Sequence, residues 1–288
     1  MSSTRIAFYT WGMHGGGHLA RAWAIRRGLE RAGIPADFRV FYGHLGVEVP
    51  RGLEVVRLTT PRIDLRDPER ARSSETARAL LDFAPDLLLV DLAWVELRYI
   101  LPILDCEAWL LLRWCHPAVI ARLREFNRAR YARTIAIEPI APSYLTDRID
   151  PIVGCNPDEC LAESALRDLF GVEQGKPISL IVQAGKPGEI EELIREEQER
   201  ANGFHVIAAS LHGKDVIFPI SHYFRGAARI VGGAGYNLFW ETRWLGVADR
   251  SELRPFVRYY DDQTPRIEAA FYKMKTNGAD VLARQIAG

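Results

Sequence analysis

The chain has 288 residues, of which 37 are lysine or arginine and 37 are aspartate or glutamate, so its formal net charge is zero. Hydrophobic residues make up 48% and charged residues 26%, which is typical of globular proteins and excludes a disordered or collagen-like chain. The charge balance argues against a strongly basic binder of nucleic acid or membrane surfaces, and the length fits two domains of about 150 residues each.

The sequence predicts no targeting or membrane-spanning segment. Its first residues lead directly into a strand-like segment, and no run approaches the roughly 18 to 20 apolar residues that cross a bilayer. We therefore expect a cytoplasmic protein, at most peripheral to a membrane. Four cysteines without CxxC spacing favour reduced thiols over a zinc site or a redox pair; they are Cys106, Cys115, Cys155 and Cys160.

Apolar segments alternate with amphipathic ones along the first half of the chain, as in βα units around a parallel sheet. After a strand at residues 5–10, Ala22, Ile25 and Leu29 recur at helical spacing within residues 19–31, and Gly33 ends that helix. A further helix is expected at residues 76–83. Further strands are expected at residues 38–42, 54–58, 86–91, 108–112 and 134–137.

The alternation of strand-like and helix-like segments stops near residues 147–159, where Pro151 and Pro157 interrupt regular structure, and this predicts a domain boundary. We expect an amino-terminal, acceptor-side domain at residues 1–150 and a carboxyl-terminal domain at 151–288, with the last helix packing back on the first domain. The second series comprises strands at 178–182, 205–209 and 229–231, a helix at 189–200 and a glycine cluster at 232–235. This is an α/β architecture.

The first glycine cluster lies between the first strand and the first helix, in the segment WGMHGGGHLARAWAIRRGL. Backbone N–H groups of such a loop and the positive end of the helix can bind an anion such as a diphosphate. The segment fits a loose dinucleotide pattern, but the next strand ends in FYG without the acidic residue that would hold an adenosine ribose. No GxxxxGK[ST] phosphate loop is present.

His18 lies where this glycine turn becomes helix and is the leading candidate for a general base. Asp91, at the end of the segment DLLLVD, could orient its other ring nitrogen. The structural alternatives are that His18 caps the helix and that Asp91 caps the following turn. His14 lies four residues before His18, but the intervening glycines prevent a shared helical face, which argues against a metal site.

A second strand, glycine turn and helix occur in the segment RIVGGAGYNLFWE. Here the chain resembles the GT-B glycosyltransferases, especially relatives of the UDP-N-acetylglucosamine transferase of lipid II synthesis. That resemblance implies two Rossmann-like domains facing a cleft, with the nucleotide-sugar bound to the carboxyl-terminal domain. Its glycine turn would hold the diphosphate and its helix glutamate the ribose, which implies donor-binding roles for Gly232, Gly233, Gly235, Tyr236, Asn237 and Glu241.

Other segments extend the resemblance. GGGHLARAWAIRRGL is similar to the family's amino-terminal glycine loop, with Gly16 and Gly17 preceding His18, and VGCNPDE is similar to its hinge. Phe218 falls where the family contacts the uracil ring, although core packing explains it equally well. In the segment YDDQ, Gln263 is a donor-sugar candidate or a surface-turn residue.

Several segments depart from the family pattern. The chain is shorter than the usual members, and the first loop of the second domain reads QAGKPG. We assign Gly185 of this loop to the donor site, and Lys186 could supply charge there or be an exposed turn residue. Residues 248–260 lack the usual proline-rich strand, and Arg254 or Arg258 could compensate.

The resemblance implies an inverting, metal-independent transferase without a cofactor of its own, which moves a sugar from a UDP-sugar, such as UDP-GlcNAc or UDP-Glc, to a hydroxyl of a small-molecule or glycolipid acceptor. No DxD motif of metal-dependent transferases is present. A compact UDP-sugar hydrolase of the nonulosonic-acid type is the first alternative. The second is a non-catalytic subunit that binds the UDP-sugar.

Overall fold

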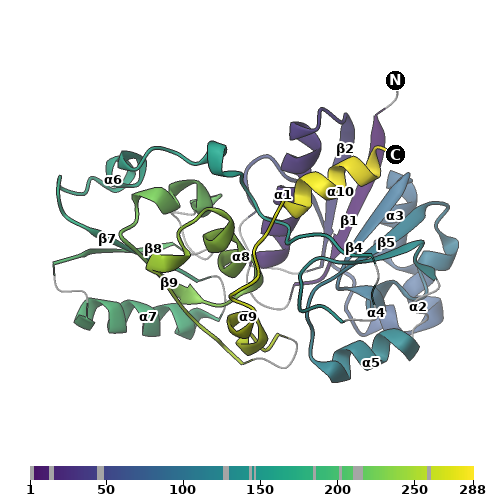
Figure 1. Cartoon of the computed structure of the whole chain (residues 1–288). Coiled ribbons are helices and arrows are strands. Elements are labelled where there is room, and N and C mark those ends of the chain that lie inside the picture. The colour runs from purple at the N-terminus through teal and green to yellow at the C-terminus, as the bar shows by residue number, and fades with distance from the viewer. Residues whose placement is uncertain are drawn as a thin grey trace.

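The computed structural model consists of two parallel sheets with helices on their faces (Figure 1). It describes residues 3–12, 16–43, 49–125, 130–142, 145, 147–183, 186–200, 203–209, 217–257 and 261–288. Gly185, His14 and Arg258, which were named above, lie outside the described residues.

The first sheet contains, within the described residues, six parallel strands in the order β3-β2-β1-β4-β5-β6. The strands are β1 (Thr4–Thr10), β2 (Ala36–Tyr42), β3 (Glu54–Arg57), β4 (Leu87–Asp91), β5 (Glu107–Leu112) and β6 (Arg133–Ala136). Every strand that was expected in this half is present, with ends that differ by one or two residues. The order reverses between β1 and β4, so the carboxyl ends of these two strands form a switch point, where open α/β sheets bind ligands.

Side chains of β1 alternate between two hydrophobic cores. Ile6 and Phe8 pack beneath α1 (Gly17–Arg31) and α10 (Gly278–Ile286), whereas Ala7 and Tyr9 face the opposite core. That second core includes residues of α2 (Pro68–Ser73), α3 (Glu75–Phe83) and α4 (Trp94–Leu97), with α5 (Pro117–Glu125) beside them. A strand covered on both faces needs apolar residues throughout, which explains the continuous apolar run of β4.

The second sheet has the order β10-β9-β7-β8 and is also parallel. Its strands are β7 (Ile178–Val182), β8 (His205–Ala209), β9 (Arg229–Gly233) and β10 (Ser251–Arg254). Strand β9 includes Gly232 and Gly233, so the expectation that both lie in a turn was wrong. Strand β10 was not expected, because its segment SELR is polar and lies only partly buried at the edge of the sheet.

The helices of the second half lie on both faces of this sheet. One face is covered by α7 (Pro187–Arg200) and the other by α6 (Ser164–Phe170) and α8 (Tyr236–Trp244). The last strand of the first sheet ends at Ala136, and the first strand of the second sheet begins at Ile178. The proposed domain division at residue 150 falls in the segment that connects the two sheets. That division stays a prediction.

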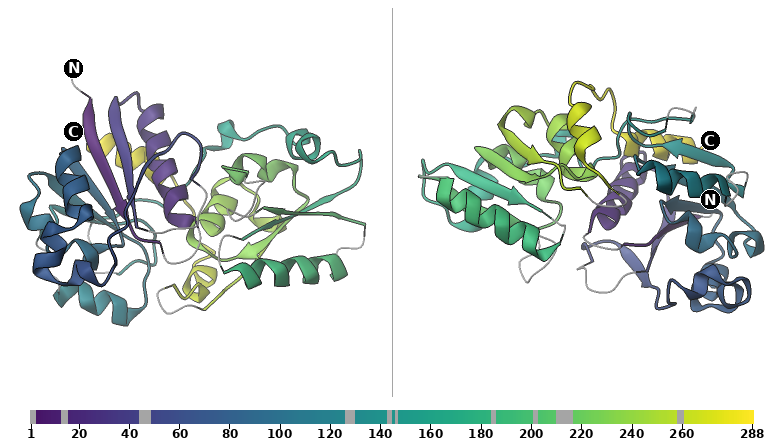
Figure 2. Two further views of the ribbon diagram at one scale, coloured as in Figure 1. Left: turned by 180° about the vertical axis from the view of Figure 1, so that it is seen from behind. Right: turned by 90° about the horizontal axis from the view of Figure 1, so that it is seen from below.

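The carboxyl-terminal segment returns to the first half of the molecule. After α9 (Thr264–Glu268), helix α10 lies against α1 and ends near the start of β1 (Figures 1 and 2). Arg31 of α1 pairs with Asp280 of α10 at 2.6 Å. At Gly28 the helices approach so closely that an added Cβ would lie 2.5 Å from the carbonyl oxygen of Ala279.

This close approach predicts an unusual effect of alanine. Alanine normally stabilises a helix relative to glycine by about 1 kcal/mol, but at Gly28 it must push the two helices apart. We expect Gly28→Ala to lower the free energy of unfolding by about 1 to 3 kcal/mol, measured by denaturant titration. The control is Gly188→Ala in α7, where an added Cβ meets no described atom within 4 Å. Equal effects of the two substitutions would contradict the packing described for α1 and α10.

Candidate functional site

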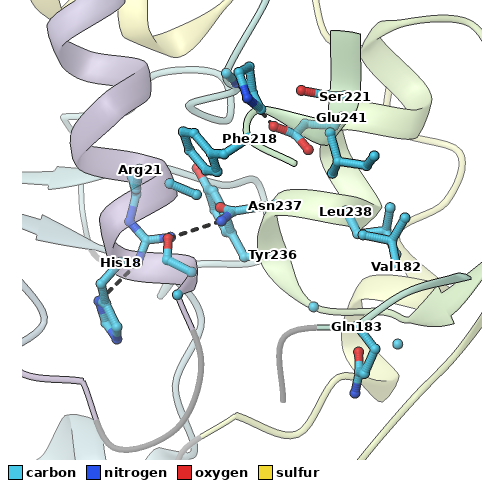
Figure 3. A pocket seen from close by; sticks show the side chains of 18 of the residues that line it. His18, Arg21, Val182, Gln183, Phe218, Ser221, Tyr236, Asn237, Leu238 and Glu241 are labelled. Carbon is cyan, nitrogen blue, oxygen red and sulfur yellow. Dashed lines mark hydrogen bonds between the residues drawn. The ribbon is translucent and has the colours of Figure 1, made fainter. Parts of the chain in front are cut away.

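A cavity of about 200 Å³ lies between the two sheets, and residues of both halves line it (Figure 3). It is bordered by the start of α1, the start of α8 and the segment that precedes β9. Ten of the residues expected from the sequence line it: Gly16, Gly17, His18, Phe218, Gly233, Gly235, Tyr236, Asn237, Glu241 and Gln263. The fold therefore brings together residues from both glycine regions.

His18 and Asp91 form a hydrogen-bonded pair at the switch point of the first sheet. Nδ1 of His18 lies 2.8 Å from Oδ2 of Asp91 and 2.9 Å from Oγ1 of Thr10. The Thr10 hydroxyl donates to the backbone oxygen of Asp91 at 3.2 Å, so it can accept from Nδ1–H. This network assigns the proton to Nδ1 and leaves Nε2 as the nitrogen that can take a proton.

The surroundings of the pair favour the neutral form of His18 and the ionised form of Asp91. Burial lowers the pKa of His18, and although Asp91 raises it, the net shift is downward. Burial alone would raise the pKa of Asp91, but Arg21 and His18 lower it well below its usual value. At neutral pH the pair is therefore a neutral imidazole beside a carboxylate, which is the resting state of a general base.

The amino-terminal ends of α1 and α8 meet at the cavity. The side-chain amide of Asn237 in α8 donates to the backbone oxygen of Gly17 in α1 at 2.9 Å, as Figure 3 shows. The residues that precede these helices, Gly16 and Gly235, make no capping side-chain hydrogen bond. Uncapped helix starts present backbone N–H groups and partial positive charge, so this junction can hold an anion.

The glycines of β9 serve close packing. A Cβ at Gly232 would lie 2.3 Å from the backbone oxygen of Val182, and one at Gly233 would lie 2.9 Å from Oε1 of Gln183. Gly232 is not among the cavity-lining residues in the described part of the chain. It thus supports the site from within the sheet, whereas Gly233 and Gly235 border the cavity.

Glu241 of α8 lines the cavity next to Ser221, with Phe218 to one side (Figure 3). Its side chain is buried, and Oε1 accepts a hydrogen bond from the backbone N–H of Gly154 at 3.3 Å. Burial raises its pKa to about 7, although the Gly154 N–H acts in the opposite direction. Among the described residues no cation pairs with Glu241, and a buried carboxylate of this kind suits a ligand that donates hydrogen bonds, such as a diol.

Phe218 packs edge-on against Trp23 of α1, with ring centroids 5.3 Å apart. Both rings line the cavity close to Glu241. Trp23 is therefore a residue of the first half of the chain that lines the part of the cavity where we expect the nucleobase.

Gln263 is buried, so the alternative that it is a surface-turn residue was wrong. Its Oε1 accepts from the backbone N–H of Phe256 at 3.1 Å. Next to it, Asp261 pairs with Arg113 at 2.7 Å and with Arg266 at 2.9 Å, and these two cations lower the pKa of Asp261 against the effect of burial. Lys186 is exposed and does not line the cavity as far as the described residues show.

A buried ion pair joins the two halves behind the cavity. Glu138, which follows β6, lies 3.0 Å from Nε of Arg266 in α9, and both side chains are fully buried. The indole of Trp240 in α8 donates to the same carboxylate at 3.0 Å. The positions of α8 and α9 relative to the first sheet are thus defined by hydrogen bonds as well as by apolar packing.

Sequence reasoning missed four charged residues of this site, Arg21, Arg113, Glu138 and Asp261, and also Thr10 and Trp23. Arg21 carried a usable signal, because it follows His18 by three residues and therefore lies on the same face of α1. The other three charged residues make contacts across 128 or more positions of the chain, and no local pattern predicts such partners.

Within the described residues, no group of three or more His, Cys, Asp or Glu side chains could hold a metal ion. None of the helices described there is both long enough and apolar enough to cross a membrane.

Comparison of the sequence with models of known protein families and with curated proteins gives no match. Comparison with solved structures does. The glycosyltransferase SsfS6 of Streptomyces sp. SF2575 is 14% identical, with a TM-score of 0.58 over 99% of this chain and 91% of that one. The spinosyn forosaminyltransferase SpnP is 14% identical, with a TM-score of 0.59 over 99% and 90%.

The spinosyn rhamnosyltransferase SpnG complexed with thymidine diphosphate is also similar, at 14% identity and a TM-score of 0.57 over 98% of this chain and 89% of that one. These similarities show the fold. The chain has the α/β GT-B fold that the sequence predicted, with two Rossmann-like units on either side of a cleft. The particular resemblance to the lipid II transferase stays a prediction.

The environment of Glu241 predicts a pH-dependent stability. Its pKa is raised from 4.5 to about 7, so folding favours the protonated form and loses stability as pH rises from 4.5 through 7. Glu241→Gln keeps an acceptor for the Gly154 N–H without the buried charge. We expect this variant to gain up to about 3 kcal/mol over the parent at pH 8 and little at pH 4.5, measured by denaturant titration.

The matched control is Glu191→Gln on the exposed face of α7, for which the difference from the parent should not vary with pH. If Glu241→Gln also shows a difference that is constant between pH 4.5 and 8, Glu241 is not a buried carboxyl group of raised pKa.

Proposed function

We propose that the chain is a glycosyltransferase that moves a sugar from a nucleoside-diphosphate sugar to a hydroxyl group of an acceptor. The observation that carries this proposal is that His18, paired with the buried Asp91, lines the same cavity as the uncapped start of α8 and the buried Glu241. One wall offers a base and the other offers an anion site and a diol site, which are the groups that such a transfer needs.

The donor lies along the second half of the chain. Its diphosphate binds at the start of α8, where Gly235 brings the backbone close and Tyr236 and Asn237 begin the helix. The ribose hydroxyls donate to Glu241, and the base packs near Phe218 and Trp23. Gln263 and Asp261 line the side of the cavity toward the first sheet and contact the sugar hydroxyls. Gly16, Gly17 and Gly185 complete this donor site.

His18 acts on the acceptor. Nε2 takes the proton of the attacking hydroxyl while Asp91 accepts from Nδ1–H and stabilises the imidazolium that forms. The acceptor oxygen bonds to the anomeric carbon as the bond from that carbon to the diphosphate breaks. Attack opposite the leaving group inverts the anomeric configuration.

The leaving diphosphate needs positive charge, and this chain offers it without a metal ion. The starts of α1 and α8 border the cavity with backbone N–H groups, and Arg113 lines the same cavity. Donors held in place before the reaction stabilise developing charge with little reorganisation. We therefore propose a metal-independent reaction with no cofactor beyond the donor substrate.

Uridine diphosphate is the proposed nucleotide, with UDP-GlcNAc or UDP-Glc as donor. Structures of SpnG and of SsfS6 are complexed with thymidine diphosphate, which supports a nucleoside diphosphate as ligand and makes thymidine diphosphate sugars the first comparison. The proposed acceptor is a small molecule or a glycolipid, approached from the cytoplasm. Nucleic acid is not proposed as a partner.

Incubation with UDP- and TDP-sugars, with and without a panel of hydroxyl acceptors, tests this proposal. We expect release of the nucleoside diphosphate that depends on the acceptor, and loss of that release by at least about a hundredfold in His18→Ala. Binding of UDP, measured by calorimetry, should remain, because His18 acts on the acceptor. The control is His205→Ala, since His205 belongs to β8 and does not line the cavity.

Two results would reject the transferase. Release of free sugar at the same rate with and without acceptor would assign a hydrolase. Nucleotide binding without any turnover across the panel would assign a binding subunit. Full activity of His18→Ala would remove the general-base role even if transfer itself is observed.

A further inference from the structure

Arg21 is a buried arginine in the second turn of α1 to which the mechanism above gives no role. Its side chain is 2% exposed, and Asp91 beside it is 0% exposed. A buried guanidinium needs partners for its charge and for its donors, because removal from water is costly. Its partners therefore indicate why the fold keeps it there.

Four contacts of Arg21 converge on the His18–Asp91 pair. Nε lies 3.1 Å from each carboxylate oxygen of Asp91, Nη2 lies 2.9 Å from Oδ2, and Nη2 lies 3.3 Å from Nδ1 of His18. Oδ2 thus accepts from Arg21 and from His18 at the same time. The planar guanidinium donates to both oxygens of Asp91 and so fixes the plane of that carboxylate. The ammonium group of a lysine could not fix the plane in this way.

The flat face of the Arg21 guanidinium packs on Tyr236, a residue of the second half of the chain. Its carbon is 4.8 Å from the centroid of the Tyr236 ring, the first residue of α8. The Tyr236 hydroxyl is itself held, since it donates to the backbone oxygen of Ile137 and accepts from the backbone N–H of Ile152, both at 2.8 Å. Arg21 is therefore held between the base and the start of the proposed donor helix.

The charges around His18 show what Arg21 changes. Among the described residues, the charged groups that act on the imidazole are Asp91 from β4, Arg21 from α1 and Arg113 after β5. Asp91 alone would favour the imidazolium, whereas both arginines disfavour it. Arg21 is the cation in direct contact with the carboxylate, so it opposes the effect of Asp91 most directly.

We propose that Arg21 is a positioning residue for the transfer reaction proposed above, on which this role rests: it holds the Asp91 carboxylate against His18 Nδ1 and offsets its charge, so that His18 rests as a neutral base. Asp91 can then orient the ring without protonating it in the resting enzyme. When the acceptor proton arrives at Nε2, the same carboxylate stabilises the imidazolium.

Titration of His18 by nuclear magnetic resonance tests this role without any substrate. The His18 signal is assigned by its absence from the spectrum of His18→Ala. In the parent protein His18 should titrate below the ordinary value of about 6.5. In Arg21→Met, which keeps the length of the side chain without its charge, the pKa should rise by about one unit or more, and in Arg21→Lys by less.

The activity of the same variants gives a second measurement. Arg21→Met should lower kcat by ten- to a hundredfold with a smaller change in KM for the donor, and the acid limb of the pH profile of kcat should move to higher pH, because His18 becomes protonated more easily. Arg26→Met is the matched control, since Arg26 lies on the exposed side of α1 and pairs with Glu30. It should leave both the titration and the profile unchanged.

The outcomes separate the two proposals. A shifted His18 titration in Arg21→Met supports the role of Arg21 at the pair even if no donor is turned over, in which case the transferase proposal alone fails. An unchanged titration in a folded Arg21→Met or Arg21→Lys protein overturns the role of Arg21. A uniform loss of kcat at every pH does the same, because it indicates a structural contribution only.

Discussion

Glu138 accepts hydrogen bonds from both halves of the molecule, and the geometry of the cavity depends on them. Its carboxylate receives Nε and Nη2 of Arg266, the indole N–H of Trp240 and the backbone N–H of Trp114. Loss of one partner from such a fully buried pair typically costs about 3 to 5 kcal/mol, because the other charge is left without compensation. Together with the apolar packing of Phe239 and Trp240, this carboxylate defines the position of α8 on the first sheet.

With α8 in that position, the starts of α1 and α8 meet at the cavity. The proposed base and the proposed donor site therefore lie next to each other. Tyr236 packs on Arg21, Asn237 bonds to Gly17, and Asp261 pairs with Arg113 across the cavity. The base belongs to the first half of the chain and the donor site to the second, so neither half holds a complete site. Their relative position is therefore part of the chemistry, as expected for ligands bound between domains.

Local sequence patterns predicted the elements that local forces dominate. The strands at residues 178–182 and 205–209 have the predicted ends. The family resemblance, and not a local pattern, placed the two glycine regions beside one cleft, where Gly16, Gly17, Gly233 and Gly235 lie. The predicted turn at Gly232 and Gly233 is a strand instead, since the neighbouring strands of the sheet extend their pairing to these residues. The ion pairs of Arg21 and Glu138 join residues 70 and 128 positions apart, so only the folded arrangement reveals them.

The central claim is that a nucleoside diphosphate binds between the starts of α1 and α8 with its ribose on Glu241. A crystal structure of the full chain with UDP tests it most directly. The account predicts phosphate oxygens within hydrogen-bond distance of the backbone N–H groups of Tyr236 and Asn237, and ribose hydroxyls within the same distance of the Glu241 carboxylate. A nucleotide bound elsewhere on the chain, or a cavity that stays without nucleotide at millimolar UDP, would contradict it.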